Sequence, residues 1–134
     1  MKNFLGIYMG RMEPGERPDQ ATMVRGMTAW HKWMADHAAS VVTSGGPLGK
    51  TKKIGHDGIA DIRNRMTGYI IVQAESHEAA AKLFEGHPHF SIFPGDSVEV
   101  MECLPIPSCH FIIKPPIFRV RLSNGNEWQP FTTT

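Results

Sequence analysis

The chain has few cysteines, no long apolar run and no excess of charge of either sign. Its 134 residues include only Cys103 and Cys109 as cysteines, and one disulfide closing so short a loop would stabilise the fold little. The sequence therefore gives no sign of a disulfide-stabilised secreted domain. No apolar run approaches the roughly 20 residues that a membrane helix needs. The first residues lack the apolar core and cleavage site of a signal peptide, so we expect a cytoplasmic protein without a membrane partner.

The charge of the chain is almost balanced. Fourteen Lys and Arg side chains stand against thirteen Asp and Glu, which gives a formal net charge of +1. Such a chain has no electrostatic reason to bind nucleic acid. Its densest basic group, GKTKK at 49–53, is typical of a solvated loop. The length and apolar content suit one domain with a real core.

Apolar patterning predicts four strands and two helices. The expected strands cover 3–10, 40–46, 68–76 and 96–104, and the expected helices cover 20–39 and 77–86. The order strand, helix, strand, strand, helix, strand predicts an α+β protein with the ferredoxin-like βαββαβ fold. In this fold both helices cover one face of an antiparallel four-stranded sheet.

Two segments of this outline carry more detailed expectations. In the first helix the predicted buried stripe consists of Met23, Val24, Met27, Trp30, Trp33, Met34 and Ala38. Residues 47–67 have weak periodicity, which predicts a long, partly extended connection with a turn at Asp57-Gly58.

The strands FLGIY and GYIIV are apolar on both alternations, which indicates burial on both faces of the sheet. A second copy of the chain is the simplest cover for the face without helices, so we expect a homodimer. Residues 1–107 form the predicted domain, and 108–134 form a C-terminal extension with one or two extra strands or an irregular arm. Four prolines between 105 and 116 favour docking of this extension outside the sheet.

The order and spacing of several short motifs resemble the YCII-related superfamily, and more closely its DGPF branch. SGGPLG follows a Trp-containing helix, DG follows at 57–58, and GYIIVQAES, EAA and VEV come later. The family's Asp-Gly-Pro-Phe is Asp57, Gly58, Ile59, Ala60 here, so only its first half is kept. The resemblance covers about residues 3–107 and implies a dimeric α+β barrel.

The same resemblance implies a histidine on the first helix and a nearby aspartate that act as an acid–base pair. His31 matches the histidine, although Trp30 competes for that position, and the aspartate is either Asp57 or Asp36. We predict His31 and Asp57 as the catalytic pair. From the residues alone, His31 lies at the edge of the apolar stripe and can hold a proton near neutral pH. The structural alternative is a boundary histidine and an Asx-turn aspartate.

Further residues are candidates for ligand binding. Tyr8 and Trp33 can line an apolar cavity, and Ser44 precedes two glycines whose amides can hold an anionic group. The alternatives are core packing for the aromatic residues and a plain turn for the glycines. His37 lies centrally on the helix stripe and is expected to be packed and bonded to the backbone.

His87 and His89 flank Pro88, and we expect them in extended chain at the rim of the pocket. Such an i, i+2 pair can point both rings to one side, as a metal site requires, but no third ligand has a recognisable spacing. We therefore predict no metal site, and the absence of phosphate-loop and flavin fingerprints predicts no cofactor.

These features predict a protein that binds a small organic molecule and acts as a cofactor-free lyase or isomerase. One alternative is a non-catalytic ligand-binding or regulatory module of the same fold. Another is an interaction protein whose tail is the binding element. The sequence does not decide whether the protein is an enzyme.

Overall fold

The structure is a computed structural model that describes residues 1–11 and 17–107. Its elements in chain order are β1 (Lys2–Met9), α1 (Gln20–Asp36), β2 (Val41–Pro47), β3 (Thr51–Gly55), β4 (Gly58–Ile62), β5 (Met66–Ala74), α2 (His77–Leu83), α3 (Pro88–Ser91) and β6 (Ser97–Glu102). Contacts divide the chain into the units Met1–Cys103 and Leu104–Thr134. The predicted extension, 108–134, lies outside the described residues. Within the described ranges no helix is long and apolar enough to cross a membrane.

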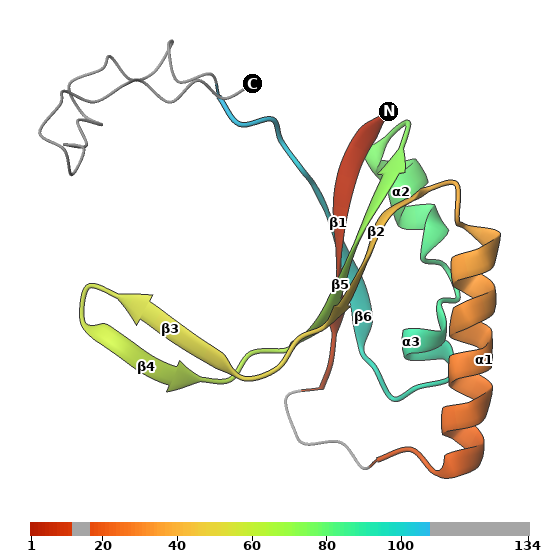
Figure 1. Cartoon of the computed structure of the whole chain (residues 1–134), viewed down its shortest axis with the longest axis horizontal. Helices are drawn as coiled ribbons and strands as arrows, with labels where there is room; N and C mark the ends of the chain where they lie inside the picture. Colours follow the sequence, from red (N-terminus) through yellow and green to blue (C-terminus); the bar gives the residue numbers. More distant parts are fainter. Residues whose placement is uncertain (12–16, 108–134) are drawn as a thin grey trace, which may run out of the picture. The chain divides into compact units, whose positions relative to one another are not determined.

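Four strands form one antiparallel sheet in the order β2-β5-β1-β6, and the helices lie on one of its faces (Figure 1). The predicted α+β class and four-stranded antiparallel sheet are therefore confirmed, and the arrangement is consistent with a ferredoxin-like fold. Period-2 alternation explains the core, because Phe4 and Tyr8 of β1 and Ile70 and Val72 of β5 share the helix-facing side. Gly6 lies between them and lets the Phe84 ring approach the strand closely.

Helix α1 begins at the N-cap Asp19, whose carboxylate accepts a hydrogen bond from the Thr22 amide at 2.7 Å. The helix ends at Asp36, three residues before the predicted end. The predicted buried stripe is partly wrong, because Met23 and Met27 are each 42% exposed.

The buried residues of α1 are Gly26 and Trp33. A side chain at Gly26 would overlap the ring of Phe93, so the bare backbone here is what allows this ring to pack on the helix. Because glycine has no apolar side chain, the pattern of apolar residues does not mark Gly26 as buried. The predicted buried stripe therefore lies on a neighbouring face of α1.

The connection 47–67, predicted to be partly extended with a turn at Asp57-Gly58, contains a β-hairpin whose turn lies at the predicted place. Strands β3 and β4 pair from Thr51 opposite Ile62 to Gly55 opposite Gly58, around a turn at His56 and Asp57. Gly58 takes the positive φ of 100° that ends this turn. Both faces of the hairpin are exposed, so its sequence shows no apolar alternation by which a strand could be recognised.

The face of the sheet opposite the helices is apolar at its centre. Leu5 pairs with Ile71 and Ile7 pairs with Tyr69, and opposed residues of antiparallel strands share a face. No helix of the described residues lies on this side (Figure 1). Ile7 is only 8% exposed, whereas its three neighbours are half-buried.

Candidate functional site

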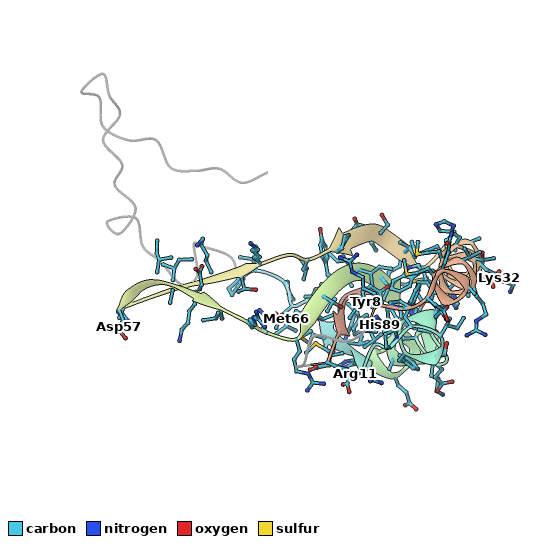
Figure 2. The ribbon with its side chains drawn as sticks, turned by 90° about the horizontal axis from the view of Figure 1, so that it is seen from below. Tyr8, Arg11, Lys32, Asp57, Met66 and His89 are labelled. Atoms are coloured by element: carbon cyan, nitrogen blue, oxygen red, sulfur yellow. The ribbon has the colours of Figure 1, made fainter. Side chains whose placement is uncertain are left out.

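An aromatic cluster that contains two buried histidines fills the space between the sheet and the helices. Tyr8 comes from β1, Trp30 and Trp33 come from α1, and His87 and His89 come from the segment around α3. The ring centroid of His87 lies 5.2 Å from that of Tyr8 and 4.6 Å from those of Trp30 and Trp33. His89 also lies 5.2 Å from Tyr8, and Figure 2 shows the labels of these two residues side by side.

The chain before α3 explains how His87 enters this cluster. Gly86 has a φ of 67°, which turns the backbone after α2. Pro88 is the first residue of α3, and His87 is its N-cap with a φ of −58° and a ψ of 139°. The predicted extended chain thus ends at His87, since a helical turn begins at Pro88. The two histidines were predicted to lie at the rim of the pocket, but both are buried in the structure, with His87 0% and His89 8% exposed.

The hydrogen bond at the N-cap fixes the protonation of the His87 ring. Its Nδ1 accepts the backbone N–H of His89 at 3.0 Å, so this nitrogen carries no proton. The neutral ring must therefore carry its proton on Nε2. Burial lowers the pKa of His87 to about 4, and the charges of His89 and His37 act in the same direction.

Two polar atoms of the cluster are buried without a hydrogen-bond partner, namely His87 Nε2 and Tyr8 Oη. Burial raises the pKa of the Tyr8 hydroxyl well above its usual value, so it remains an O–H group. Nε2–H and Oη–H are both donors, and they lie in one cluster of apolar and aromatic walls. Buried donors without partners are uncommon in proteins and costly to keep.

His89 is held in a different way. Its Nε2 lies 2.8 Å from the Met9 carbonyl oxygen, and because a carbonyl only accepts, Nε2 is the donor. In the neutral ring Nδ1 is then unprotonated and basic. Gly95 makes room for this ring, since a Cβ there would lie 2.5 Å from the ring atoms Cε1 and Nε2.

A hollow of about 290 Å³ lies beside the cluster. Its lining residues are Ala81, Phe84, Glu85, Phe90, Asp96, Ser97, Val98 and Val100. Two of the lining residues are neighbours of the cluster: Val98 pairs with Tyr8 across the sheet, and the Phe84 ring lies 6.0 Å from the His87 ring. The two donors themselves are closed off from solvent.

The structure brings four of the predicted site residues together: Tyr8, Trp33, His87 and His89. Trp33 is 8% exposed and donates its indole N–H to the Leu83 carbonyl at 3.0 Å, so it also has a clear structural role. His37, predicted to be bonded to the backbone, donates Nδ1–H to the Trp33 carbonyl at 2.8 Å, which confirms that prediction.

The remaining predicted residues lie elsewhere. His31 is exposed on α1, and Asp57 is exposed at the tip of the hairpin. Figure 2 shows Asp57 at the opposite end of the view from Lys32, the neighbour of His31, so one chain does not bring this pair together. Ser44 is exposed on β2, and the glycines after it belong to that strand and do not form a separate turn.

Sequence reasoning missed the pairing of Tyr8 with His87. The signal available was the string Gly86-His87-Pro88, in which glycine closes the turn after α2 and proline starts α3. In the structure the residue between them, His87, is fully buried. Among residues 1–11 and 17–107, no three His, Cys, Asp or Glu side chains gather as a metal site would require.

Comparisons with known proteins give a likeness to solved structures but to no family model. No protein-family model matches the chain, and neither does any curated protein. A similar solved structure is 5-chloro-2-hydroxyhydroquinone dehydrochlorinase (TftG) from Burkholderia phenoliruptrix AC1100, in complex with 2,5-dihydroxybenzoquinone. The identity is 21%, the match covers 73% of this chain and 89% of that chain, and the TM-score is 0.46. These values are too low to assign the chain to a family or to transfer an activity to it.

Proposed function

We propose that this protein binds a small organic molecule with a carbonyl group between its sheet and its helices. The observation that supports this is the pair of buried donors, Tyr8 Oη–H and His87 Nε2–H, which lack partners in one aromatic cluster. Two donors call for an acceptor, and a carbonyl oxygen can accept both. The aromatic walls favour a flat apolar body for the rest of the molecule.

The same groups support cofactor-free proton transfer. Donors aimed at a carbonyl oxygen stabilise the negative charge that develops there when a proton leaves the adjacent carbon. A neutral histidine and a tyrosine hydroxyl suit this task, since neither needs to ionise. His89 Nδ1, which is unprotonated in the neutral ring, is the proposed base. It would take a proton from carbon and return it elsewhere in an isomerisation, or keep it while a leaving group departs in an elimination.

The hollow beside the cluster is the proposed entrance. A ligand there would rest on Phe84, and rotation of this ring would expose the His87 edge. The carboxylates of Glu85 and Asp96 at the hollow disfavour an anionic ligand, although Arg65 pairs with Asp96 at 2.7 Å. A neutral ketone, lactone or quinone therefore fits better than a carboxylic acid.

A matched pair of probes tests the binding claim. 1-Indanone accepts hydrogen bonds through its carbonyl, whereas 1-indanol has nearly the same shape and a hydroxyl instead. Titration followed by NMR should show tighter binding of the ketone. Tyr8→Phe should reduce that preference by about tenfold, as expected for one buried hydrogen bond. Equal affinity of the wild-type protein for both probes would contradict the proposal.

Two histidine variants separate the roles within the site. His87→Asn keeps an acceptor near Nδ1 for the helix cap and removes Nε2–H, so it should weaken ketone binding without loss of α3. His89→Gln keeps a donor for the Met9 carbonyl and removes the basic nitrogen. It should leave ketone binding intact but abolish deuterium exchange at the carbon next to the carbonyl. Binding without such exchange in the wild-type protein would instead favour the non-catalytic ligand-binding module.

The proposal includes a homodimer formed through the uncovered face of the sheet. Leu5, Tyr69 and Ile71 on this face are apolar and half-buried, and an apolar surface of this kind is typical of an interface. Sedimentation of the full chain should show two copies per particle. A single copy at all concentrations would contradict this part of the proposal.

A further inference from the structure

The β3–β4 hairpin is an uncovered element. Every residue from Lys52 to Asn64 is exposed, and in the described part of the chain β3 and β4 pair only with each other. A two-stranded hairpin alone is at best marginally stable in water. The hairpin therefore needs a surface to pack against.

One face of the hairpin is suited to an interface. Ile54 and Ile59 lie opposite each other across the strands and are 72% and 71% exposed. The next pair on this face is Lys52 and Asp61, joined by an ion pair of 2.7 Å. The other face carries Ala60 opposite Lys53 and has no comparable apolar pair.

The hairpin continues the ribbon formed by β2 and β5 (Figure 1). After β2, the Leu48 amide donates to the Thr67 carbonyl at 2.9 Å. Closer to the hairpin, the Asn64 side-chain amide donates to the Thr51 hydroxyl at 3.1 Å. The same β5 carries Tyr69 and Ile71 of the uncovered sheet face, so the two apolar surfaces belong to one continuous ribbon.

Charge favours a second copy of the chain as the occupant. Residues 48–65 contain five basic and two acidic side chains, whereas residues 95–103 contain three acidic and no basic side chains. Some of these charges pair inside one copy, namely Lys52 with Asp61, Arg65 with Asp96, and Glu102 with Lys2. The complementarity between copies therefore depends on Glu99 of β6 and on the remaining basic side chains of the hairpin, Lys50, Lys53 and Arg63. Residues 95–103 include the edge strand β6, on which Glu99 lies opposite Ile7 of the uncovered face. A basic hairpin and an acidic strand edge in the same molecule can satisfy each other in a twofold dimer.

We propose that the hairpin is an arm with which each copy of this chain grips the other. Ile54 and Ile59 of one copy pack at the margin of the uncovered sheet face of its partner, and the basic side chains of the arm approach β6. This inference extends the proposed homodimer, since that dimer could also form through the sheet faces alone.

Neighbouring substitutions on opposite faces of the arm test the inference in the full chain. Ile59→Lys should weaken the dimer by at least about tenfold, as expected for loss of a central apolar contact. Ala60→Lys is the matched control and should change the dissociation constant by less than about twofold, since surface substitutions away from contacts have small effects. Sedimentation equilibrium measures both constants, and circular dichroism checks that the variants fold.

Hydrogen exchange of the hairpin amides provides a second readout. They should be protected in the dimer and exchange freely in a monomer, produced by Ile71→Lys or, where that variant does not fold, by dilution of the wild-type protein.

Three results would overturn the inference. If Ile71→Lys weakens the dimer and Ile59→Lys does not, the arm is not part of the interface, although the proposed homodimer stands. A wild-type protein that is monomeric would contradict both the arm and the proposed homodimer. Hairpin amides that stay protected in a monomer would mean that another part of the same chain covers the arm.

Discussion

The rings of Tyr8 and His87 lie 5.2 Å apart in the core, yet neither Oη nor Nε2 has a hydrogen-bond partner. Burial of an unpaired donor opposes folding, and proteins depart from full pairing mostly where function requires it. The backbone bond that occupies Nδ1 of His87 leaves only Nε2 free to act. This relationship is the basis of the first two predictions.

Tyr8→Phe should leave the stability of the ligand-free protein unchanged or raise the free energy of unfolding by up to about 1 kcal/mol. The substitution removes a buried hydroxyl that has no partner and keeps the ring packed against Trp30, 4.9 Å away. Urea unfolding measures the change. A loss of stability of about 1 kcal/mol or more would show that Oη is bonded in the free protein, for example to a buried water.

Stability should fall as the pH decreases from about 6.5 to 4. The pKa of His87 is lowered from 6.5 to about 4 by burial, so in this range the unfolded chain binds a proton that the folded protein does not. The contribution of His87 is fully present above pH 6.5; the shift corresponds to about 3 kcal/mol, which screening by solvent reduces to roughly 2 kcal/mol. Unfolding free energies across this range should have a smaller slope for His87→Asn. An unchanged slope would show that other groups dominate.

Gly26→Ala should destabilise the protein by about 1–3 kcal/mol, because the new methyl group would overlap the Phe93 ring. In most helices the same change stabilises by about 0.5–1 kcal/mol, so the sign is informative. Combining it with Phe93→Leu should recover part of the loss, which a double-mutant cycle measures. Gly49→Ala is the control, since a Cβ there meets no atom within 4 Å.

His31→Ala and Asp57→Asn should leave the affinity for 1-indanone within about twofold of wild type, as is usual for exposed positions away from a site. Both residues are exposed and lie outside the cluster. NMR titration with a check of the dimer tests this. A large loss of binding in an intact dimer would contradict this prediction. It would support His31 and Asp57 as the site, with the two residues supplied by different copies.

The core strands and helices were predictable because each has one buried face. In β1, Phe4 and Tyr8 are buried on the same face of the strand, as a period of two residues predicts. In α2, Ser76 caps the helix by accepting the Ala79 amide at 3.0 Å. Segments without a buried face gave no such signal. For the segment around Asp57 the sequence predicted extended chain and a turn but not two paired strands, because both faces of the hairpin are exposed.

The candidate site could not be predicted from local patterns. Tyr8 and His87 are 79 positions apart, and they meet only because α3 turns back beneath α1. Gly26 likewise decides which face of α1 is turned toward the core, because the lack of a side chain there allows Phe93 to approach.

The sequence by itself determined the α+β class, the order of the main elements and the apolar character of both sheet faces, since local periodicity carries this information. Only the tertiary structure decided which polar groups would be buried together and left unpaired. That outcome depends on packing between distant segments, and no local pattern records which side chains those contacts will enclose.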